Sequence, residues 1–569
     1  MATLRDLLKR DVNPFGTIEP RSGNFWEEQQ DENLTVDSIH QAELYQMITA
    51  IERVTKDRRT RTLLLRGDVA SGKSYLLGRL KKQLNHRAFF AYIGSWSDDR
   101  YIWRHVLRHT VDSLMYAPEG EENSQLLLWL KGLSAFQENS LRKKILGERG
   151  LFIQNFRGTY PVGIYRAKEF FGVLYDLTNP ELYPLACDWL RGEDLENSDL
   201  RALGVKTSID SEDSAQNILT NFGKISSAAK YPIVLCFDQL DQALQPPEGD
   251  LALQALLGVN TTFHNEKLKN FTVIISLLRQ TWNQHEARIL TADRDRFDLE
   301  IDLKDINLDQ AEAIWANYLA PLHRQANPKP QSPIEPLTRQ NLEQQYPGGK
   351  TQPRYIIKLG EQLIQKHKLG KVTAPDRIAA FSQIWDKEHQ RNHQTIQRIR
   401  FFSSIELVQM LKQVLQALQV PQLAVRFLKN KNYGSYSCSY KHPKTEETIG
   451  IFWSEDPRMQ SFFYGVQACV KEIEQKNCDR LILIRSEKLG QASNKGYKLF
   501  QQTFTGKPHR HIIPHLDSVH QLATYASLAK AASAGELVVG YDTPNLAQLE
   551  AIVRESRILN KCILLQDLE

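Results

Sequence analysis

A short segment between Gly67 and Ser74 has the residue types and spacing of a phosphate-binding loop. It reads G-D-V-A-S-G-K-S and follows an apolar run that begins at Arg61. Glycines at these positions let the backbone turn tightly and aim its N–H groups at phosphate oxygens. The lysine reaches the β- and γ-phosphates, and the hydroxyl after it binds Mg²⁺. The sequence therefore predicts a site for ATP with Mg²⁺.

Nine consecutive residues of this loop and the helix after it are the predicted nucleotide ligands. Lys73 is also predicted to stabilise phosphate charge during the reaction, and Ser74 is the first of two predicted metal ligands. A chance match on a glycine-containing turn is the alternative, which the strand before the loop and the helix pattern after it disfavour. The nine residues are Gly67, Asp68, Val69, Ala70, Ser71, Gly72, Lys73, Ser74 and Tyr75.

A second motif, Tyr231 to Asp241, contains an apolar strand that ends in Asp238. A P-loop fold holds Mg²⁺ with a carboxylate at this position, so Asp238 is the second predicted metal ligand. A buried parallel strand that ends in a turn aspartate has the same pattern, and the P-loop upstream favours the metal role. Gln239 is predicted to position water, with Asp241 as a substitute base if the turn brings it inward.

A third apolar run, Phe271 to Arg279, follows a helical pattern. Ser276, within this run, is predicted to present its hydroxyl to the γ-phosphate. Strands that alternate with helices indicate a parallel sheet with helical crossovers. The expected fold class is therefore α/β.

The composition indicates a multidomain globular protein. The 569 residues exceed what one hydrophobic core supports, and the net charge of +5 does not by itself indicate a nucleic-acid binder. Six cysteines show no C-x-x-C pair and no accompanying histidine pair, which argues against a zinc site and against a disulfide framework. The chain shows neither a secretory nor a membrane-spanning pattern, so we expect a cytoplasmic protein without a membrane partner.

Five segments are expected along the chain. Residues 1–40 are predicted to form an extended arm with little regular structure, whose end can pack on an adenine ring. Residues 41–304 form an α/β base. Because Lys73 and Asp238 are 165 positions apart (238 minus 73), the base includes a helical insertion around 105–220, where protein partners commonly bind. A helical lid at 305–398 is followed by C-terminal α/β segments at 399–490 and 491–569.

Together these motifs resemble an AAA+ ATPase. They are most similar to the origin-recognition and replication-initiator group and its bacterial relatives, over residues 30–395. In that family a glycine-rich turn followed by Pro-Arg delivers a lid arginine to the nucleotide. Gly348, Gly349, Pro353 and Arg354 match that pattern. The resemblance therefore implies that Arg354 senses nucleotide from the lid.

The same resemblance implies a homo-oligomer, in which an arginine reaches the γ-phosphate bound by a neighbouring subunit. Arg296 matches this arginine, with Arg294 as an alternate, and a loop of surface arginines is the other interpretation. The segment Trp189 to Gly192 is also similar to a stretch in ATPases of bacterial phage-defence islands.

Gln239 departs from the family pattern, in which a glutamate polarises the attacking water. Glutamine cannot take a proton, although it can orient water. The sequence therefore predicts slow hydrolysis, or ATP that serves chiefly as an ordering ligand which closes the lid and builds the oligomer.

Residues 404–486 predict the order helix, three strands, helix, strand, which is similar to the core of restriction-endonuclease-type nucleases. A working member carries Glu-x-Lys on one strand, and the strand from Ile449 to Trp453 lacks it, so the implied domain is an inactive nuclease that binds DNA or a partner. The tail is expected to be a winged-helix variant or a completion of the α/β layer. Candidate DNA-facing groups are Lys429, Lys431, Lys441 and Lys444.

The leading hypothesis is an ATP-binding AAA+ switch with slow hydrolysis that oligomerises and acts on double-stranded DNA, in defence, mobile-element or replication-linked work. One alternative is a STAND-type signalling ATPase that recognises a protein partner. A second is an active nuclease whose metal site uses Glu446, Glu455 and Asp456 with Lys444. A third is a nucleotide-stabilised scaffold without turnover.

Overall fold

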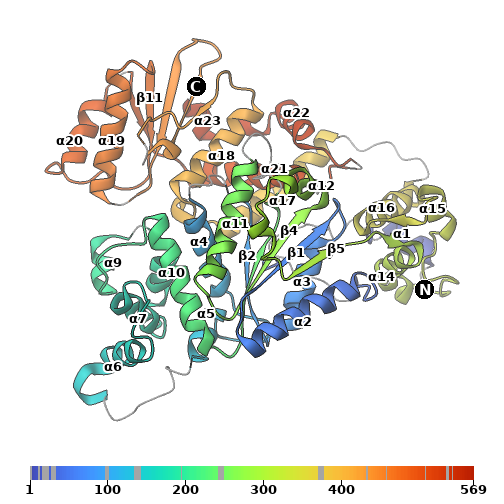
Figure 1. The fold of residues 1–569 in the computed structure, drawn as a ribbon. Helices are drawn as coiled ribbons and strands as arrows, with labels where there is room; N and C mark the ends of the chain where they lie inside the picture. Colours follow the sequence, from blue (N-terminus) through green and yellow to red (C-terminus); the bar gives the residue numbers. More distant parts are fainter. Residues whose placement is uncertain are drawn as a thin grey trace. The chain divides into compact units, whose positions relative to one another are not determined.

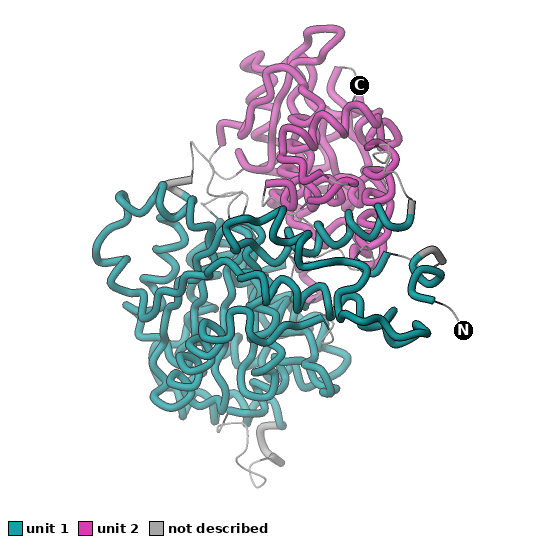
Figure 2. Tube along the Cα trace, turned by 90° about the vertical axis from the view of Figure 1, so that its right-hand side faces the viewer, with its two compact units in different colours: residues 1–193, 200–373 teal, residues 194–199, 374–569 magenta. Residues whose placement is uncertain are grey.

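The chain divides into two compact units, drawn in teal and magenta in Figure 2. Unit 1 comprises Met1–Glu193 and Leu200–Thr373, and unit 2 comprises Asp194–Asp199 and Ala374–Glu569. The computed structural model describes residues 3–10, 13–15, 25–26, 34–96, 101–133, 143–193, 195–240, 249–369, 377–430, 433–456, 458–506, 508–533, 537–540 and 542–568.

Unit 1 is built on a five-stranded sheet in the order β2-β3-β4-β1-β5. Every neighbouring pair in this sheet is parallel. The three strands predicted from apolar runs are β1, β3 and β4, and all residues of β3 are buried, as expected of a parallel strand covered on both faces. The predicted α/β class is therefore confirmed. The strands are β1 (Arg61–Gly67), β2 (Phe89–Ile93), β3 (Ile233–Phe237), β4 (Phe271–Leu278) and β5 (Leu299–Asp302).

Helices cover both faces of this sheet (Figure 1). On one face, α2 (Gln41–Asp57) and α3 (Lys73–Leu84) bury apolar side chains against β1 and β4 in a single cluster. Elsewhere α4 (Ile102–Met115) packs on β2, and α11 (Gly249–Asn265) packs on α4. With both faces covered, the polar ends of the strands are the parts of the sheet left for chemistry.

The described part of the long connection between β2 and β3 contains helices and no strand, as the predicted insertion requires. Arg191, which is half-buried, pairs with Asp112 of α4 (2.9 Å) and with Asp188, three positions before it (2.6 Å). After α4, the helices are α5 (Gln125–Lys131), α6 (Lys143–Thr159), α7 (Ala167–Asp176), α8 (Tyr183–Leu190), α9 (Asn197–Ala202) and α10 (Glu212–Ile225).

A helical lid follows β5. The short antiparallel pair of β6 (Ile306–Asn307) and β7 (Lys350–Thr351) closes the segment that holds α14 (Leu308–Gln325) and α15 (Arg339–Gln345), and α16 (Pro353–Leu369) comes next. The N-terminal arm joins this lid, because α1 (Leu4–Arg10) packs on α14 and α16. The prediction of an arm with little regular structure is therefore wrong at α1, whose Leu7 and Leu8 enter the apolar core of the lid.

Unit 2 contains a second five-stranded sheet, in the order β12-β11-β10-β9-β8. The predicted order of helix, three strands, helix, strand is confirmed. The first of these strands, β8 (Ala424–Val425), has only two residues, and Gln422 and Arg426 on either side of it take positive φ angles of 50° and 58°. The strands are β8 (Ala424–Val425), β9 (Ser437–Lys441), β10 (Thr448–Trp453), β11 (Arg480–Ile484) and β12 (Arg510–Ile512).

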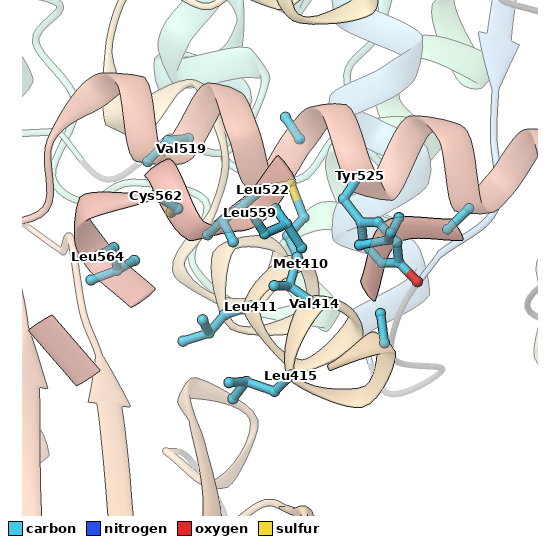
Figure 3. Close-up of a cluster of buried hydrophobic side chains, with 14 of the residues drawn as sticks. Met410, Leu411, Val414, Leu415, Val519, Leu522, Tyr525, Leu559, Cys562 and Leu564 are labelled. Atoms are coloured by element: carbon cyan, nitrogen blue, oxygen red, sulfur yellow. The ribbon is translucent and has the colours of Figure 1, made fainter. Parts of the chain in front are cut away.

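The tail contributes β12 to the second sheet. β12 pairs in parallel with β11, and among the described residues an isolated bridge joins Val539 and Asp542. Figure 3 shows α21 placing Val519, Leu522 and Tyr525 against α18. The helices are α17 (Arg377–Thr395), α18 (Ser404–Ala417), α19 (Met459–Glu474), α20 (Lys495–Phe504), α21 (Leu516–Ser533), α22 (Leu546–Ser556) and α23 (Ile563–Leu568).

Among the described residues, no helix has both the length and the apolar character needed to cross a bilayer. All six cysteines are free thiols in buried positions.

The close approach of the arm to the lid makes Gly360 a sensitive position. A Cβ at Gly360 would lie 2.7 Å from the Phe15 ring and 2.8 Å from Trp315 Nε1. Exchange of glycine for alanine within a helix ordinarily stabilises by about 1 kcal/mol. For Gly360→Ala we expect the opposite sign, a loss of about 1–3 kcal/mol from overpacking, seen as a lower midpoint of thermal unfolding.

Gly258→Ala in α11 is the matched control, because nothing lies within 4 Å of the Cβ that it adds. We expect its unfolding midpoint to stay level or rise. A Gly360→Ala protein as stable as the Gly258→Ala protein would show that the arm does not pack on the lid in solution.

Candidate nucleotide-binding site

The predicted phosphate-binding loop connects β1 to α3 at the carboxyl edge of the sheet. β1 lies between β4 and β5, so its end is inside the sheet and not at its margin. The loop turns with positive φ angles at Ala70 (65°) and Gly72 (95°). A Cβ at Gly67 would lie 2.5 Å from Ser71 Oγ, so only glycine permits this close turn. The loop therefore has the geometry of a phosphate cradle.

The interior of the cradle offers polar groups to a ligand. Ser71 Oγ is buried and has no hydrogen-bond partner among the described residues. Lys73 Nζ donates to the carbonyl oxygens of Gly67 (3.3 Å) and Asp68 (3.2 Å), which keeps the ammonium group over the loop. Carbonyl oxygens are neutral acceptors, so the ammonium gains charge-assisted hydrogen bonds when phosphate oxygens approach. These groups fit the β- and γ-phosphates of a nucleotide.

The two predicted metal ligands meet directly. Ser74 Oγ donates to Asp238 Oδ2 at 2.5 Å, although the residues stand on different elements 164 positions apart. Asp238 is 1% exposed, directly after β3, and its backbone N–H donates to the carbonyl of Ile93 at the end of β2. Hydroxyl and carboxylate oxygens are the ligands that Mg²⁺ takes in proteins. The pair therefore fits the predicted ion.

Gln239 follows Asp238 with a left-handed φ of 57°, an unusual conformation for this residue type. Its side chain is half-buried at the turn after β3. The predicted substitute base, Asp241, lies outside the described residues. The role of Gln239 in positioning water remains a prediction.

The end of β4 lies between the ends of β1 and β3. It carries Ser276, which was predicted from the sequence, and it is followed by Arg279, which the sequence prediction missed. Ser276 is buried opposite Leu65 of β1, and its Oγ has no hydrogen-bond partner among the described residues. Arg279 follows the strand and forms an ion pair with the loop: its Nε is 3.6 Å from Asp68 Oδ1. An arginine beside the cradle is the better candidate to respond to phosphate charge.

Arg279 also connects the loop to the strand that leads to the lid. It donates from Nη2 to the carbonyl of Leu303 (2.9 Å), and its Nη1 lies 3.6 Å from Asp302 Oδ1. Asp302 in turn pairs with Arg66 at 2.8 Å. The only sequence signal for Arg279 is its place as the first charged residue after the apolar run of β4.

The end of the arm bridges the loop and the lid. His40 Nε2 donates to the carbonyl of Ser71 (2.8 Å), and Thr35 Oγ1 is 2.7 Å from Tyr75 Oη. Towards the lid, α14 contacts the same segment, because Asn317 donates to the carbonyl of Thr35 (2.9 Å) and Gln310 to that of Ser38 (3.0 Å). The arm is therefore positioned, as predicted, beside the nucleotide site.

The predicted arginines lie on separate parts of unit 1. Arg354 is half-buried in the first turn of α16, after a turn in which Gly349 has a φ of 68°. Arg296 donates to Thr261 Oγ1 (3.1 Å) and to Asn265 Oδ1 (3.0 Å) of α11. Arg294 pairs with Glu286 at 2.6 Å. The roles in nucleotide sensing and in reaching a neighbouring subunit remain predictions.

The alternative nuclease site in unit 2 is not assembled. Glu455 follows the end of β10, whereas Glu446 and Lys444 lie in the hairpin before its start, which places them about 17 Å away at the length of a six-residue strand. The carboxylate of Glu455 accepts hydrogen bonds from Ser486 N (3.0 Å) and Trp453 Nε1 (3.0 Å), and burial raises its pKa. Glu455 is therefore engaged by groups of its own unit, at the opposite end of β10 from Glu446 and Lys444.

The predicted DNA-facing lysines are spread over the β8–β10 region. Lys441 ends β9 and is half-buried, and Lys444 is exposed in the hairpin before β10. Lys429 follows β8, the edge strand of the sheet, and its backbone N–H donates to Glu472. Lys431 lies outside the described residues.

The contact between His40 and the loop predicts a pH dependence. Burial lowers the pKa of His40 from its ordinary value of 6.5, although the hydrogen bond to Ser71 opposes the shift. Below pH 6.5 the unfolded chain therefore binds a proton that the folded chain resists, and stability falls as the pH falls. We expect the unfolding midpoint of wild type to drop more than that of His40→Gln between about pH 7.5 and about pH 5.5.

His367→Gln, at an exposed position in α16, controls for the loss of a histidine as such. It should retain the full pH dependence of wild type. Equal pH dependence in the His40→Gln and His367→Gln proteins would contradict the buried contact.

Comparison with known proteins gives a limited likeness. No protein-family model and no curated protein matches the sequence. Among solved structures, the Aeropyrum pernix ORC2 protein in ADPNP-ADP complexes is 7% identical, with a TM-score of 0.29, over 64% of this chain and 78% of that chain. The Aeropyrum pernix ORC1 protein in complex with DNA is 11% identical, with a TM-score of 0.30, over 70% of this chain and 75% of that one. Both TM-scores are low, so the function proposed below rests on the geometry of this chain.

Proposed function

We propose that this protein is an ATP-binding switch of the AAA+ type, with slow hydrolysis. The observation that carries the proposal is the 2.5 Å contact between Ser74 of the P-loop helix and the buried Asp238. A buried carboxylate costs free energy unless its charge is compensated, and a single hydroxyl compensates it only in part. Mg²⁺ held by these two oxygens supplies the missing positive charge and neutralises charge on the β- and γ-phosphates.

The remaining roles follow from where the side chains lie. Lys73 and the N–H groups of the loop bind the phosphates, and Arg279 exchanges its contact with Asp68 for phosphate oxygens. Gln239 orients water without taking its proton, which makes hydrolysis slow. The segment from Thr35 to His40 packs beside the base of the nucleotide and transmits its presence to α14.

The output of the switch is proposed on the resemblance of the motifs. Arg354 senses the nucleotide from the lid, and Arg296 reaches a neighbouring subunit of a homo-oligomer, for which it must exchange its hydrogen bonds to α11. We propose double-stranded DNA as the partner, in defence, mobile-element or replication-linked work. A signalling ATPase that binds a protein through the insertion or unit 2 is the alternative.

Two substitutions separate phosphate binding from metal binding. Lys73→Ala should weaken ATP binding about 10-fold or more both with Mg²⁺ and with a chelator, since a hydrogen bond to a charged group contributes about 1.5–3 kcal/mol. Asp238→Asn should bind ATP as tightly as wild type does when a chelator is present, and Mg²⁺ should no longer raise its affinity for ATP. Titration calorimetry on the full chain measures both effects.

Lys56→Ala, at an exposed position near the end of α2, is the control and should bind ATP as wild type does. If Asp238→Asn keeps the Mg²⁺-dependent affinity for ATP, Asp238 does not bind the metal. If Lys73→Ala binds ATP as tightly as wild type does, the P-loop is not the nucleotide site.

Gln239→Glu tests the slow step. The left-handed backbone cost at this position is the same for both side chains, so the exchange changes only the ability to take a proton. We expect faster steady-state ATP turnover, by about 10-fold or more, since a positioned general base contributes about 10²–10⁴-fold. Turnover is measured with and without duplex DNA, and stimulation by DNA would support the proposed partner.

Gln239→Ala completes the comparison, because it removes the side chain that orients water. It should be slower than wild type. If both Gln239 variants hydrolyse ATP at the wild-type rate, Gln239 does not limit the reaction and the proposed cause of slow turnover is wrong.

A further inference from the structure

Three metal-ligating side chains converge in unit 2, far from the nucleotide site in sequence. They are His389 on α17 and Asp517 and His520 on α21, and their ligand atoms lie within 4.8 Å of one another. Asp517 and His520 are three positions apart on one helix, a spacing that places both side chains on the same face. The two helices pack together, and Asn392 Nδ2 of α17 donates to Thr524 Oγ1 of α21 at 3.0 Å.

One ring nitrogen of His520 makes a hydrogen bond, and the other makes none among the described residues. The residue is 2% exposed, and its Nε2 donates to the carbonyl of Ile396 at 2.8 Å. With the proton on Nε2, Nδ1 carries a lone pair. This Nδ1 is buried and has no hydrogen-bond partner among the described residues. A ring that donates one N–H to a backbone carbonyl and turns the other nitrogen inward has the arrangement of a metal-binding histidine.

His389 and Asp517 complete the site. His389 Nε2 is 3.3 Å from Asp517 Oδ1, yet this nitrogen makes no hydrogen bond in the described part of the chain. Two ligands on a tetrahedral zinc ion, each bonded at about 2.0–2.1 Å, stand about 3.3 Å apart. The second carboxylate oxygen of Asp517 accepts from Gln521 Nε2 at 2.7 Å, which fixes the orientation of the carboxylate.

We propose that His389 Nε2, Asp517 Oδ1 and His520 Nδ1 bind a zinc ion that fastens α17 to α21. Two imidazoles and one carboxylate suit zinc, whereas Mg²⁺ and Ca²⁺ take oxygen ligands. Asp517 is half exposed and His389 a quarter exposed, so the ion reaches the site from solvent and water fills the fourth position. No motif in the sequence indicates this site, because its ligands come together only when the two helices pack.

α21 has an apolar side and, opposite it, a polar side that faces α17. Val519, Leu522 and Tyr525 hold the first side in the apolar cluster with α18 (Figure 3). The side facing α17 is instead lined by polar groups, including Thr524 and Ser527, whose Oγ donates to Glu388 at 2.6 Å. α17 also contributes Phe381 and Trp385 to the apolar cluster, and zinc adds metal–ligand bonds to the polar part of the contact between α17 and α21.

The test uses the full chain, stripped of metal and titrated with Zn²⁺ in competition with a chromogenic chelator. We expect one tight site per chain and a higher midpoint of thermal unfolding when it is filled. Co²⁺ added in place of Zn²⁺ should give the visible absorption bands of a four-coordinate site. His389→Gln should weaken Zn²⁺ at least about 100-fold, since loss of an outer hydrogen-bond partner alone costs about 10–100-fold.

His515→Gln is the matched control, because His515 is exposed just before α21 and does not belong to the ligand group. It should bind Zn²⁺ as wild type does. His389 lies at the surface edge of the site, so its variant should keep the wild-type far-UV circular dichroism, which removes misfolding as the cause of a loss. Zn²⁺ binding by His389→Gln equal to that of His515→Gln, or no tight site in wild type, would overturn the proposal and leave a plain histidine–aspartate ion pair.

Discussion

The contact between Ser74 and Asp238 is the constraint on which unit 1 depends. It requires the ends of β1 and β3 to lie close together, although β4 separates the two strands in the sheet. Because the strands are parallel, all three ends meet at one edge, and the loop, the carboxylate and Arg279 arrive there from distant parts of the sequence. The helices on both faces, the long insertion and the lid are arranged around this edge.

Two physical connections run from the phosphate cradle to the lid. One passes from Asp68 through Arg279 to Asp302 and Leu303, next to the strand pair that begins the lid. The other passes from Ser71 through His40 to the arm, and from the arm to α14. Negative charge arriving at the cradle competes for Arg279, so it acts on the first connection directly. A switch of the proposed kind needs such differential contacts, since a ligand shifts an equilibrium only by its unequal affinity for the two states.

The fold class and the central site were predictable because their signals are local. A buried parallel strand is a continuous apolar run, and the P-loop is a contiguous motif, so β1, β3, β4 and the pair of Ser74 and Asp238 followed from the sequence. What the sequence did not reveal depends on contacts between distant segments. Arg279 pairs with Asp68 and Asp302, which lie far from it in the sequence. The convergence of His389 with His520 exists only once two helices pack.

The strand order also sets when the site can exist during synthesis. β1 lies between β4 and β5, so the strand that carries the P-loop has no partner in the sheet until the chain has been extended past Leu278, and it lacks its second partner until Asp302. The insertion can fold earlier from local helix–helix contacts, whereas parallel pairing across such separations is slow. The P-loop is therefore synthesised long before the sheet edge at which it lies is complete, and a nucleotide bound there as proposed would stabilise only chains that have already completed the base.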